Sequence, residues 1–485
     1  MTGNAEFQEK RWLALILLAA AQFVVVLDAS IVNVALPTIG KALDFSDENL
    51  PWIVNAYVLT FGGFLLLGGR TADLLGRRRV FMAGLMLVAV ASLAAGFAAT
   101  EGQLIAARAA QGLGAAIISP AALSIVTTIF RDGAERNKAL GVWGAVAGAG
   151  GAAGVLLGGI LTDGLGWEWV LWVNVPVSLI AFALAPRLIA ESRASDQARA
   201  FDIAGAVTIT AALSLLVYAV IDASEAGWGS TKTLGLIALA LVLLAAFVAI
   251  ELRSRKPLVP FSIFRIRTLT GANVVGVLVG ASLFSMFFFI SLYMQQVLGY
   301  SAIHAGLSYL PLAVTISLAA GVASQLVTTL GYKTVLAAGL LFIVAGLLWF
   351  SRISVGGGFT TDILGPSLLA AIGLGFSFVT TTIAAVSGVE EEESGLASGL
   401  INTSQQVGGA LGLAVLSSLA TTHTEDLLGS GSGLKHALTE GFQAAFLGGA
   451  AIAALGFVLT LVLIKSSDSR AHVEIGKAEA EGAEA

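Results

Sequence analysis

Apolar runs that are long enough to cross a lipid bilayer alternate with short polar segments along almost the whole chain. A helix needs about 20 mostly apolar residues to span the hydrocarbon core, and the sequence offers fourteen such runs. They begin near Trp12, Trp52, Val80, Gln103, Ala139, Val170, Ile203, Thr233, Gly271, Gly306, Val335, Ile363, Leu400 and Phe442. We therefore predict an all-α membrane protein with fourteen transmembrane spans.

Basic residues are distributed unevenly among the segments between these runs. With the N-terminus placed in the cytoplasm, only four of the 26 Lys and Arg residues fall in outer segments: Lys41, Lys232, Arg352 and Lys435. Arg108 lies inside a span, and all the others fall in cytoplasmic segments. Because cytoplasmic loops are enriched in Lys and Arg, this split favours an even number of spans with both termini in the cytoplasm.

The composition agrees with a bilayer as the solvent and excludes several classes of function. Of the 485 residues, 57% are hydrophobic and 12% are charged, and the mean hydropathy is +0.89. There is no cysteine, the histidines are scattered, and no phosphate-cradling loop for ATP is present. We expect no enzyme activity, no metal site, no other cofactor and no nucleic-acid partner.

Asp28 is the one acid that lies deep inside a predicted span, and Arg108 is expected at a similar depth. Asp28 lies roughly 12 Å from the outer end of the first span and Arg108 roughly 8–9 Å from the outer end of the fourth. Burial disfavours a charged carboxylate, whereas a neighbouring guanidinium favours it, and conformation can shift that balance. We predict that Asp28 carries a proton and that Arg108 modulates it. A purely structural pair is the alternative. Gln111, on the same helix face as Arg108, either binds substrate or orients Arg108.

The segment 69–79 joins the second and third spans by a tight cytoplasmic turn. Gly76 allows the sharp reversal, and Asp73 is placed to pair with Arg77 or Arg78. Such a pair would hold one conformation closed on the cytoplasmic side. The alternative is that the basic residues only set the orientation in the membrane.

The two halves of the chain repeat each other weakly. A degenerate copy of segment 69–79 occurs at 328–333, and the glycine-rich fifth span has a counterpart in the thirteenth span. The glycines concerned are Gly144, Gly148, Gly154 and Gly158, with Gly408, Gly409 and Gly412. Repeated halves around a central site are a common plan of transporters. We predict two six-helix bundles, 1–190 and 269–465, an inserted two-helix linker at 191–268, and a disordered cytoplasmic tail at 466–485.

Amide and aromatic side chains within several spans are candidates for binding a bulky lipophilic substrate. The candidates are Asn33, Asn55, Gln111, Phe288, Tyr293, Gln296, Asn402 and Gln405. The alternative for the aromatic residues is that Phe faces lipid and Tyr lies at the membrane interface.

Together these stretches resemble the major facilitator superfamily, and within it the fourteen-span drug:proton antiporters. The resemblance extends from about Trp12 to Lys465 and is carried by segments 27–37, 69–79, 108–114, 150–159 and 396–403. It implies the major facilitator fold, an inner gating loop that includes Gly69, and proton transfer at the 108–114 segment. The chain departs from the family pattern at Thr71, Val155 and Glu168.

The resemblance also implies that segment 150–159 is the antiporter motif, in which small residues let helices pack closely. The glycines that carry this motif here are Gly150, Gly154, Gly158 and Gly159.

The predicted function is proton-coupled export of lipophilic or cationic drug-like compounds across the bacterial plasma membrane. We expect a monomer, driven by the proton gradient, whose two bundles rock around a central site. No second acid lies deep in the C-terminal half, which favours one main proton site. A dedicated exporter of one antibiotic or metabolite is the alternative among transporters. A non-transporting membrane sensor on the same fold is the alternative from another class.

Overall fold

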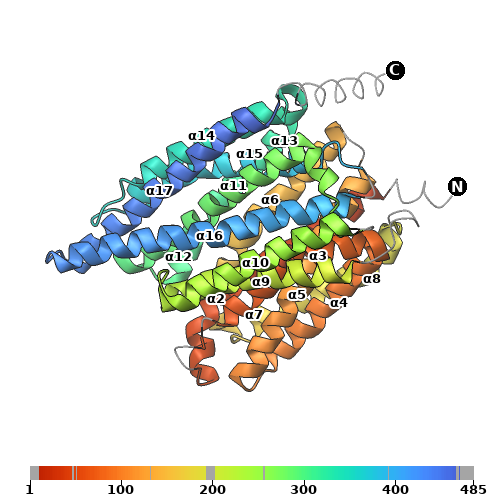
Figure 1. Cartoon of the computed structure of the whole chain (residues 1–485). Helices are drawn as coiled ribbons and strands as arrows, with labels where there is room; N and C mark the ends of the chain where they lie inside the picture. Colours follow the sequence, from red (N-terminus) through yellow and green to blue (C-terminus); the bar gives the residue numbers. More distant parts are fainter. Residues whose placement is uncertain are drawn as a thin grey trace. The chain divides into compact units, whose positions relative to one another are not determined.

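The computed structural model describes residues 10–45, 49–50, 52–130, 133–192, 202–254, 257–390, 393–465 and 469. Within these residues the regular elements are all helices (Figure 1). Most of the tail for which disorder is predicted, 466–485, lies outside the described residues, as do residues 1–9.

The helices follow one another with short connections. In chain order they are α2 (Arg11–Ala42), α3 (Trp52–Leu75), α4 (Arg77–Gly96), α5 (Glu101–Ile129), α6 (Ala134–Gly164), α7 (Trp169–Trp172), α8 (Asn174–Leu188), α9 (Ile203–Ala226), α10 (Thr231–Arg253), η2 (Phe261–Arg265), α11 (Arg267–Leu292), η3 (Tyr293–Val297), α12 (Ala302–Ser308), α13 (Leu310–Leu330), α14 (Tyr332–Phe350), η4 (Phe359–Ile363), α15 (Leu364–Val386), α16 (Ser394–Gly429) and α17 (Leu434–Leu463). Each of the fourteen apolar runs falls on one of these helices or on two consecutive ones.

Thirteen of the candidate spans are both long and apolar enough to cross a membrane among the described residues. The fourteenth predicted span corresponds to α16, a helix of 36 residues that is long enough but more polar. Its N-terminal half carries the polar run from Asn402 to Gln406. A spanning helix with such a run must turn it toward protein or water rather than toward lipid.

The chain divides into two compact units. Unit 1 comprises Met1–Arg131, Gly150–Ile266 and Gly388–Thr403, and unit 2 comprises Asp132–Ala149, Arg267–Ser387 and Ser404–Ala485. The long helices α6 and α16 therefore each contribute one part to each unit. The bundle boundaries predicted from the sequence, with a separate linker at 191–268, remain a prediction.

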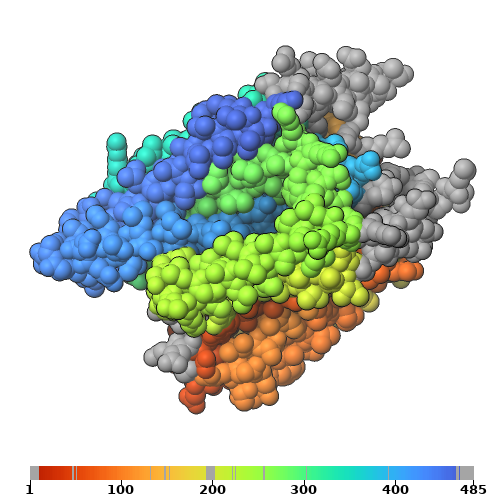
Figure 2. Space-filling view, in the orientation of Figure 1, coloured from red at the N-terminus to blue at the C-terminus, as the bar shows by residue number. Residues whose placement is uncertain are grey.

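The predicted inserted pair, α9 and α10, belongs to unit 1, and α9 packs against α3. The rings of Trp52 and Tyr218 stack with their centroids 5.8 Å apart. Nearer the middle of α3, Gly62 and Gly63 leave room for Val217 and Ser214 of α9. The helix α10 covers α9 and runs along the visible face of the molecule in Figure 2.

Large apolar side chains lie exposed along α10 on this face. They are Leu234, Leu239, Leu241, Val242, Val248 and Leu252. Only 17% of its apolar window is buried by protein. Exposed apolar side chains over a whole helix length are unfavourable in water and favourable in hydrocarbon. This face therefore agrees with a helix that lies against lipid.

Candidate functional site: a buried charge pair and a loop clamp

Asp28 on α2 and Arg108 on α5 contact each other directly inside unit 1. Arg108 Nη1 donates to Asp28 Oδ2 over 2.8 Å, and the two side chains are 0% and 2% exposed. The similar depth expected from the two spans thus corresponds to an ion pair. Since charges buried from water are retained only when they are paired and hydrogen-bonded, the remaining polar atoms of this pair must also have partners.

The carboxylate of Asp28 receives two further hydrogen bonds. Gln111 Nε2 donates to Oδ1 over 3.2 Å, and Asn174 Nδ2 from α8 donates to the same oxygen over 2.5 Å. Gln111 also accepts from Arg108 Nη1 at 3.0 Å and donates to Ser92 Oγ at 2.7 Å. Gln111 therefore bonds both members of the pair, whereas the role predicted for it, binding substrate or orienting Arg108, remains a prediction.

The guanidinium of Arg108 is held on its other side by α3. Its Nε donates to the carbonyl oxygen of Ile53 over 2.9 Å. Its Cζ lies 4.5 Å from the ring centroid of Tyr57, which is a cation–π contact. The Tyr57 hydroxyl in turn donates to the carbonyl oxygen of Val25 over 2.9 Å. Helices α2, α3, α4, α5 and α8 thus all contribute to one buried polar cluster.

Three members of this cluster were not predicted from the sequence. They are Tyr57, Ser92 and Asn174, and each is buried. Asn174 had a detectable signal, because a carboxamide followed by Pro176 stands within an otherwise apolar run. Tyr57 and Ser92 carry no comparable signal, since hydroxyl and phenol groups are common within membrane helices.

The hydrogen bonds that the Asp28 carboxyl group can make depend on whether each neighbouring group donates, accepts or does both. Arg108 only donates, so it stabilises the ionised form of Asp28. The amides of Gln111 and Asn174 carry both a donor and an acceptor, so after rotation they bond a neutral carboxylic acid as well. A proton on Asp28 would remove the charge that holds Arg108. The groups around the Asp28 carboxyl are thus one guanidinium that only donates and two amides that can donate or accept.

The residues of segment 69–79 form a second cluster in unit 1, in which Asp73 bonds the N-terminus of α16. Asp73 Oδ1 accepts from Gly395 N over 3.1 Å, and Oδ2 accepts from Leu396 N over 3.0 Å. Arg77 donates to Oδ1 from both Nε and Nη2 over 3.1 Å. A carboxylate at a helix N-terminus is favoured by the unpaired N–H groups and the helix dipole.

The other predicted members of this loop have distinct places. Gly76 adopts a φ of 109°, which only glycine takes easily, and it separates α3 from α4. Arg78 bonds the carbonyl oxygen of Ile189 over 3.1 Å instead of Asp73. Gly69 packs directly on Gly395 and Gly399, so it allows α3 to approach α16 closely.

The glycines of the antiporter-motif segment pack against α2, the helix that carries Asp28. A Cβ added to Gly150 would lie 2.9 Å from Val26 Cβ, and one on Gly154 would lie 3.0 Å from the carbonyl oxygen of Leu27. One on Gly158 would lie 2.6 Å from the carbonyl oxygen of Ile31. Gly159 beside it is also buried. Glycines four residues apart thus let this part of α6 approach α2 closely.

The remaining substrate candidates do not form one cluster. Asn33 is exposed and bonds the carbonyl oxygens of its own helix, and Asn55 is half-buried on α3. Asn402 accepts a long hydrogen bond of 3.4 Å from Ser119 Oγ. Among the described residues, no hydrogen bond joins one of these candidates to another.

In unit 2 the predicted candidates also have different environments. Phe288 and Gln296 are exposed, whereas Gln405 is buried. Tyr293 is buried, and its hydroxyl contacts Ser354 in the loop before η4 and Asp362 within η4. The substrate-binding role of all these residues remains a prediction.

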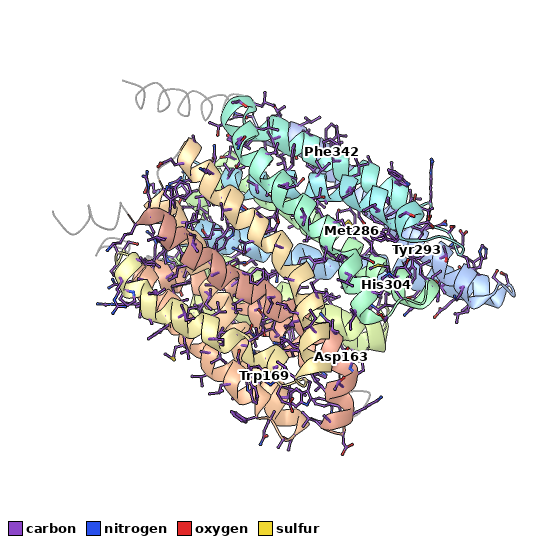
Figure 3. The ribbon with its side chains drawn as sticks, turned by 180° about the vertical axis from the view of Figure 1, so that it is seen from behind. Asp163, Trp169, Met286, Tyr293, His304 and Phe342 are labelled. Atoms are coloured by element: carbon purple, nitrogen blue, oxygen red, sulfur yellow. The ribbon has the colours of Figure 1, made fainter. Side chains whose placement is uncertain are left out.

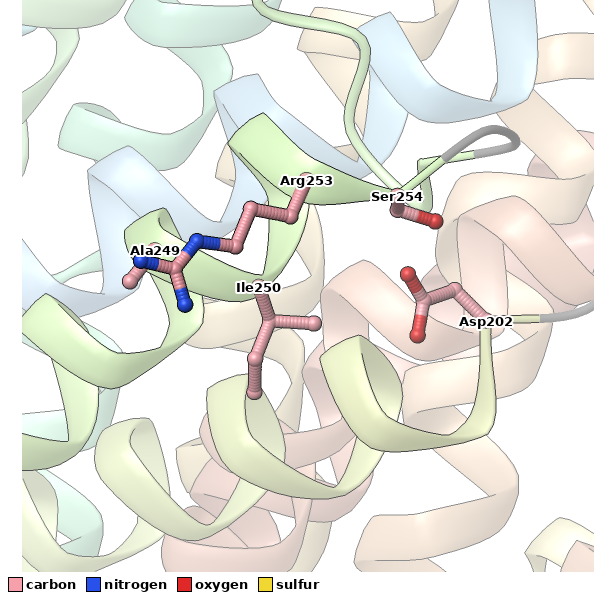
Figure 4. A pocket seen from close by; sticks show the side chains of 5 residues that line it. All are labelled: Asp202, Ala249, Ile250, Arg253 and Ser254. Atoms are coloured by element: carbon pink, nitrogen blue, oxygen red, sulfur yellow. The ribbon is translucent and has the colours of Figure 1, made fainter.

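One pocket in unit 1, at the start of α9 and the end of α10, shares no lining residue with either cluster. Its lining residues are Asp202, Ala249, Ile250, Arg253 and Ser254 (Figure 4). No predicted substrate residue lines it. Among the described residues, no group of three or more His, Cys, Asp or Glu side chains is arranged to hold a metal ion.

Comparison with known proteins identifies the class. The profile of the Major Facilitator Superfamily matches residues 18–413. The chain belongs to this superfamily, and it is therefore a multi-pass membrane transporter rather than an enzyme. The fold is shared with the proton:xylose symporter XylE, with a TM-score of 0.66 at 12% identity, covering 94% of this chain and 96% of that one.

Its more similar relatives are efflux and resistance proteins of bacteria. The puromycin resistance protein pur8 of Streptomyces alboniger is 38% identical over 477 residues, covering 97% of this chain and 94% of that protein. The cephamycin export protein CmcT of Amycolatopsis lactamdurans is 40% identical over 465 residues, covering 95% and 94%. The multidrug resistance protein Stp of Mycobacterium tuberculosis is 32% identical over 466 residues, covering 95% and 83%.

Proposed function

We propose that this protein exports lipophilic drug-like compounds across the bacterial plasma membrane in exchange for protons. The observation that carries the proposal is the fully buried pair of Asp28 and Arg108, which the two amides of Gln111 and Asn174 complete. A buried carboxyl group that can be bonded in either protonation state suits proton exchange. The relatives' names, resistance and export proteins, support the outward direction of transport.

In the proposed cycle, a proton from outside binds Asp28 and releases Arg108 from its charge partner. Arg108 would then bond backbone carbonyls or substrate, and the helices around it would rearrange. Return of the proton to the cytoplasm restores the ion pair. The proton gradient is the energy source, so the cycle needs no cofactor.

The clamp between Asp73 and the N-terminus of α16 is proposed as the inner gate. It joins the α3–α4 turn to α16 by charge-assisted hydrogen bonds. An opening toward the cytoplasm has to break these bonds, so their strength sets how readily the transporter faces inward. We propose fourteen spans, both termini in the cytoplasm and a monomer as the working unit.

A dedicated exporter of one compound is the second candidate. It is favoured by the names of pur8 and CmcT, each of which refers to a single antibiotic. Stp favours breadth instead. A panel of chemically unrelated lipophilic compounds, each tested for export by the wild-type protein, separates the two: several substrates support the multidrug function, and one supports the dedicated exporter.

The decisive experiment is substrate-induced proton release from the protein reconstituted in lipid vesicles. We expect coupled flux of a lipophilic dye such as ethidium, or of a substrate found in the panel, in the wild type. The variant Asp28→Asn should lose this coupling, because the amide cannot exchange a proton. Asp163→Asn is the matched control, since Asp163 is exposed and should leave coupling unchanged. Coupled exchange at wild-type rates in Asp28→Asn would falsify the proposal.

A further inference from the structure

The N-terminus of α4 has no capping side chain of its own. Gly76 occupies the N-cap position, and the first turn of α4 contains no acid. It contains three arginines in succession instead, Arg77, Arg78 and Arg79. The first N–H groups of a helix lack intrahelical acceptors, and the helix dipole disfavours cations at this end. This end of α4 therefore needs an acceptor and a negative charge from elsewhere in the fold.

Glu191, which closely follows α8, supplies both. Its Oε1 accepts from the backbone N of Arg78 over 3.1 Å, and a Cβ on Gly76 would lie 2.8 Å from the same oxygen. Its Oε2 lies 3.8 Å from Arg78 Nε and 3.6 Å from Arg79 Nε. The side chain is 22% exposed, so solvent screens these charges only in part. The carboxylate thus lies directly on the α3–α4 turn and caps α4 from a distant part of the sequence.

The residues beside Glu191 bond the same turn. The backbone N of Arg77 donates to the carbonyl oxygen of Ser192 over 2.9 Å, and Arg77 Nη1 makes a longer contact of 3.5 Å with Ser192 Oγ. Arg78 Nη1 donates to the carbonyl oxygen of Ile189 over 3.1 Å. Segment 189–192 therefore holds the start of α4 through both backbone and side-chain contacts.

Arg77 connects this segment to the clamp between Asp73 and α16. Its side chain is 1% exposed and donates to Asp73 Oδ1 from Nε and Nη2, each over 3.1 Å. Its Nη1 donates to Thr128 Oγ1 over 2.7 Å. Asp73 in turn accepts from two backbone N–H groups at the start of α16. Because hydrogen bonds weaken steeply when their angle changes, a shift of the first turn of α4 would weaken the hold of Arg77 on Asp73.

We propose that Glu191 is a positioning residue of the clamp, which caps α4 and thereby fixes Arg77 where its guanidinium holds Asp73. Loss of the cap lets the first turn of α4 and Arg77 shift, and the attachment of α16 to α3 weakens. The inference rests on the proposed inner gate and deepens it, because it extends the gate from the α3–α4 turn to the segment that follows α8.

The test measures access to the start of α16 with a single cysteine. The chain has no native cysteine, and Leu396 is 0% exposed, so maleimide labels Leu396→Cys only when this end opens. Labelling rates are measured for the full chain in lipid nanodiscs. We expect Glu191→Ala to accelerate labelling about fivefold, the factor that one net hydrogen bond contributes. Glu191→Gln should have a smaller effect, because its amide oxygen still accepts from the backbone N of Arg78.

A double-mutant cycle shows whether Glu191 acts through the clamp. In a Leu396→Cys chain that also carries Asp73→Ala, the clamp is absent, so adding Glu191→Ala should change the labelling rate by less than about twofold. A residue that only stabilised unit 1 would instead accelerate labelling by the same factor in both backgrounds. The second reporter is Leu104→Cys, which is 0% exposed in the apolar core of unit 1 beside Trp167. Its labelling should stay equally slow with and without Glu191→Ala.

Glu168→Ala is the matched control. A Cβ on Gly166 would lie 2.6 Å from Glu168 Oε2, and Gly166 has the same φ of 109° as Gly76. The side chain of Glu168 makes no cap hydrogen bond at the start of α7. Figure 3 shows Trp169, the residue after Glu168, together with Asp163 near the turn that joins α6 to α7. Removal of this carboxylate should leave the labelling of Leu396→Cys unchanged.

Two results would overturn the proposal while leaving the gate itself in place. One is unchanged labelling of Leu396→Cys in Glu191→Ala, and the other is an equal acceleration with and without Asp73→Ala. If Asp73→Ala alone leaves labelling slow, the inner gate fails and this inference fails with it. None of these results bears on proton coupling at Asp28, because labelling is measured without substrate or a proton gradient.

Discussion

At the scale of single residues, the buried charge pair depends on the shape of the arginine side chain as well as on its charge. The planar guanidinium of Arg108 reaches Ile53, Asp28 and Gln111 at once. A lysine ammonium is a compact charge that cannot reproduce this fork. Removal of the cation leaves the buried carboxylate without its charge partner. The free-energy cost of that unpaired charge is larger than the stabilisation that the intact pair contributes.

The first prediction concerns stability. Arg108→Ala should lower the free energy of unfolding by about 3–5 kcal/mol, because Asp28 is left unpaired in a buried site. Arg108→Lys should fall between Arg108→Ala and the wild type. Adding Asp28→Asn to Arg108→Ala should restore part of the loss, since a neutral amide needs no counter-ion. Chemical unfolding of the detergent-purified protein measures all these variants.

The control for this prediction is Arg79→Ala. Arg79 lies 3.6 Å from Glu191 but is 71% exposed, so solvent screens the pair and its removal should change stability little. If Arg108→Ala proved as stable as Arg79→Ala, the pair would not be the buried ion pair described.

At the scale of helices, close approach through glycine decides how α2 is held. The part of α6 in unit 1 presents Gly150, Gly154 and Gly158 to α2. Sequence alone predicted that these glycines pack, but not against which helix. Their partner is the helix that carries Asp28, so the antiporter-motif segment packs directly against the helix of the proposed proton site.

The second prediction compares two glycines of this helix. Gly158→Ala should destabilise the protein by about 1–3 kcal/mol, because the added methyl group meets the backbone oxygen of Ile31, which cannot move aside easily. Gly151→Ala is the control, since a Cβ there has no neighbour within 4 Å. Equal melting temperatures for the two variants, measured by thermal unfolding in detergent, would contradict the proposed packing.

The third prediction concerns the contact between α3 and α16. Asp73→Ala removes the acceptor of two N–H groups at the start of α16, so this end should open more often. A cysteine at Leu396, which is 0% exposed, reports the opening by its labelling rate. We expect the double variant Leu396→Cys with Asp73→Ala to be labelled about tenfold faster than Leu396→Cys alone. This factor corresponds to the free energy that charge-assisted hydrogen bonds contribute to the closed state.

Asp163→Ala in the same reporter background provides the comparison for this experiment. Asp163 is exposed at the far end of α6, so its removal should leave the labelling rate unchanged. Labelling that stays slow in Asp73→Ala would show that the clamp does not limit access to this end.

At the scale of the whole molecule, the order of spans and the basic loops set the expected topology. The fourth prediction tests it with single cysteines at exposed basic positions in intact cells. A membrane-impermeant maleimide should label cysteines at Lys232 and Lys435, which are predicted outside, but not at Arg187 and Arg253, which are predicted inside. After the cells are opened, all four should react. Labelling of Arg187→Cys in intact cells would contradict fourteen spans with cytoplasmic termini.

Much of the fold follows from amino-acid order alone, because each membrane helix satisfies its own backbone hydrogen bonds and is recognisable by its apolar length. The same rule marked Asp28 and Arg108, since charged groups in lipid are rare and costly. Asp73 and Gly76 were recognisable for a different reason, because the residues that form a tight turn are close together in the sequence.

Only the tertiary structure could reveal which groups meet across helices. Asn174 and Tyr57 join Asp28 and Arg108 from helices distant in sequence, and α16 supplies the partner of Asp73. Helix packing sets these contacts through the angle and depth of neighbouring helices, neither of which the periodicity of one helix encodes. Hydrophobic length therefore determines the helices, whereas their packing determines the chemistry between them.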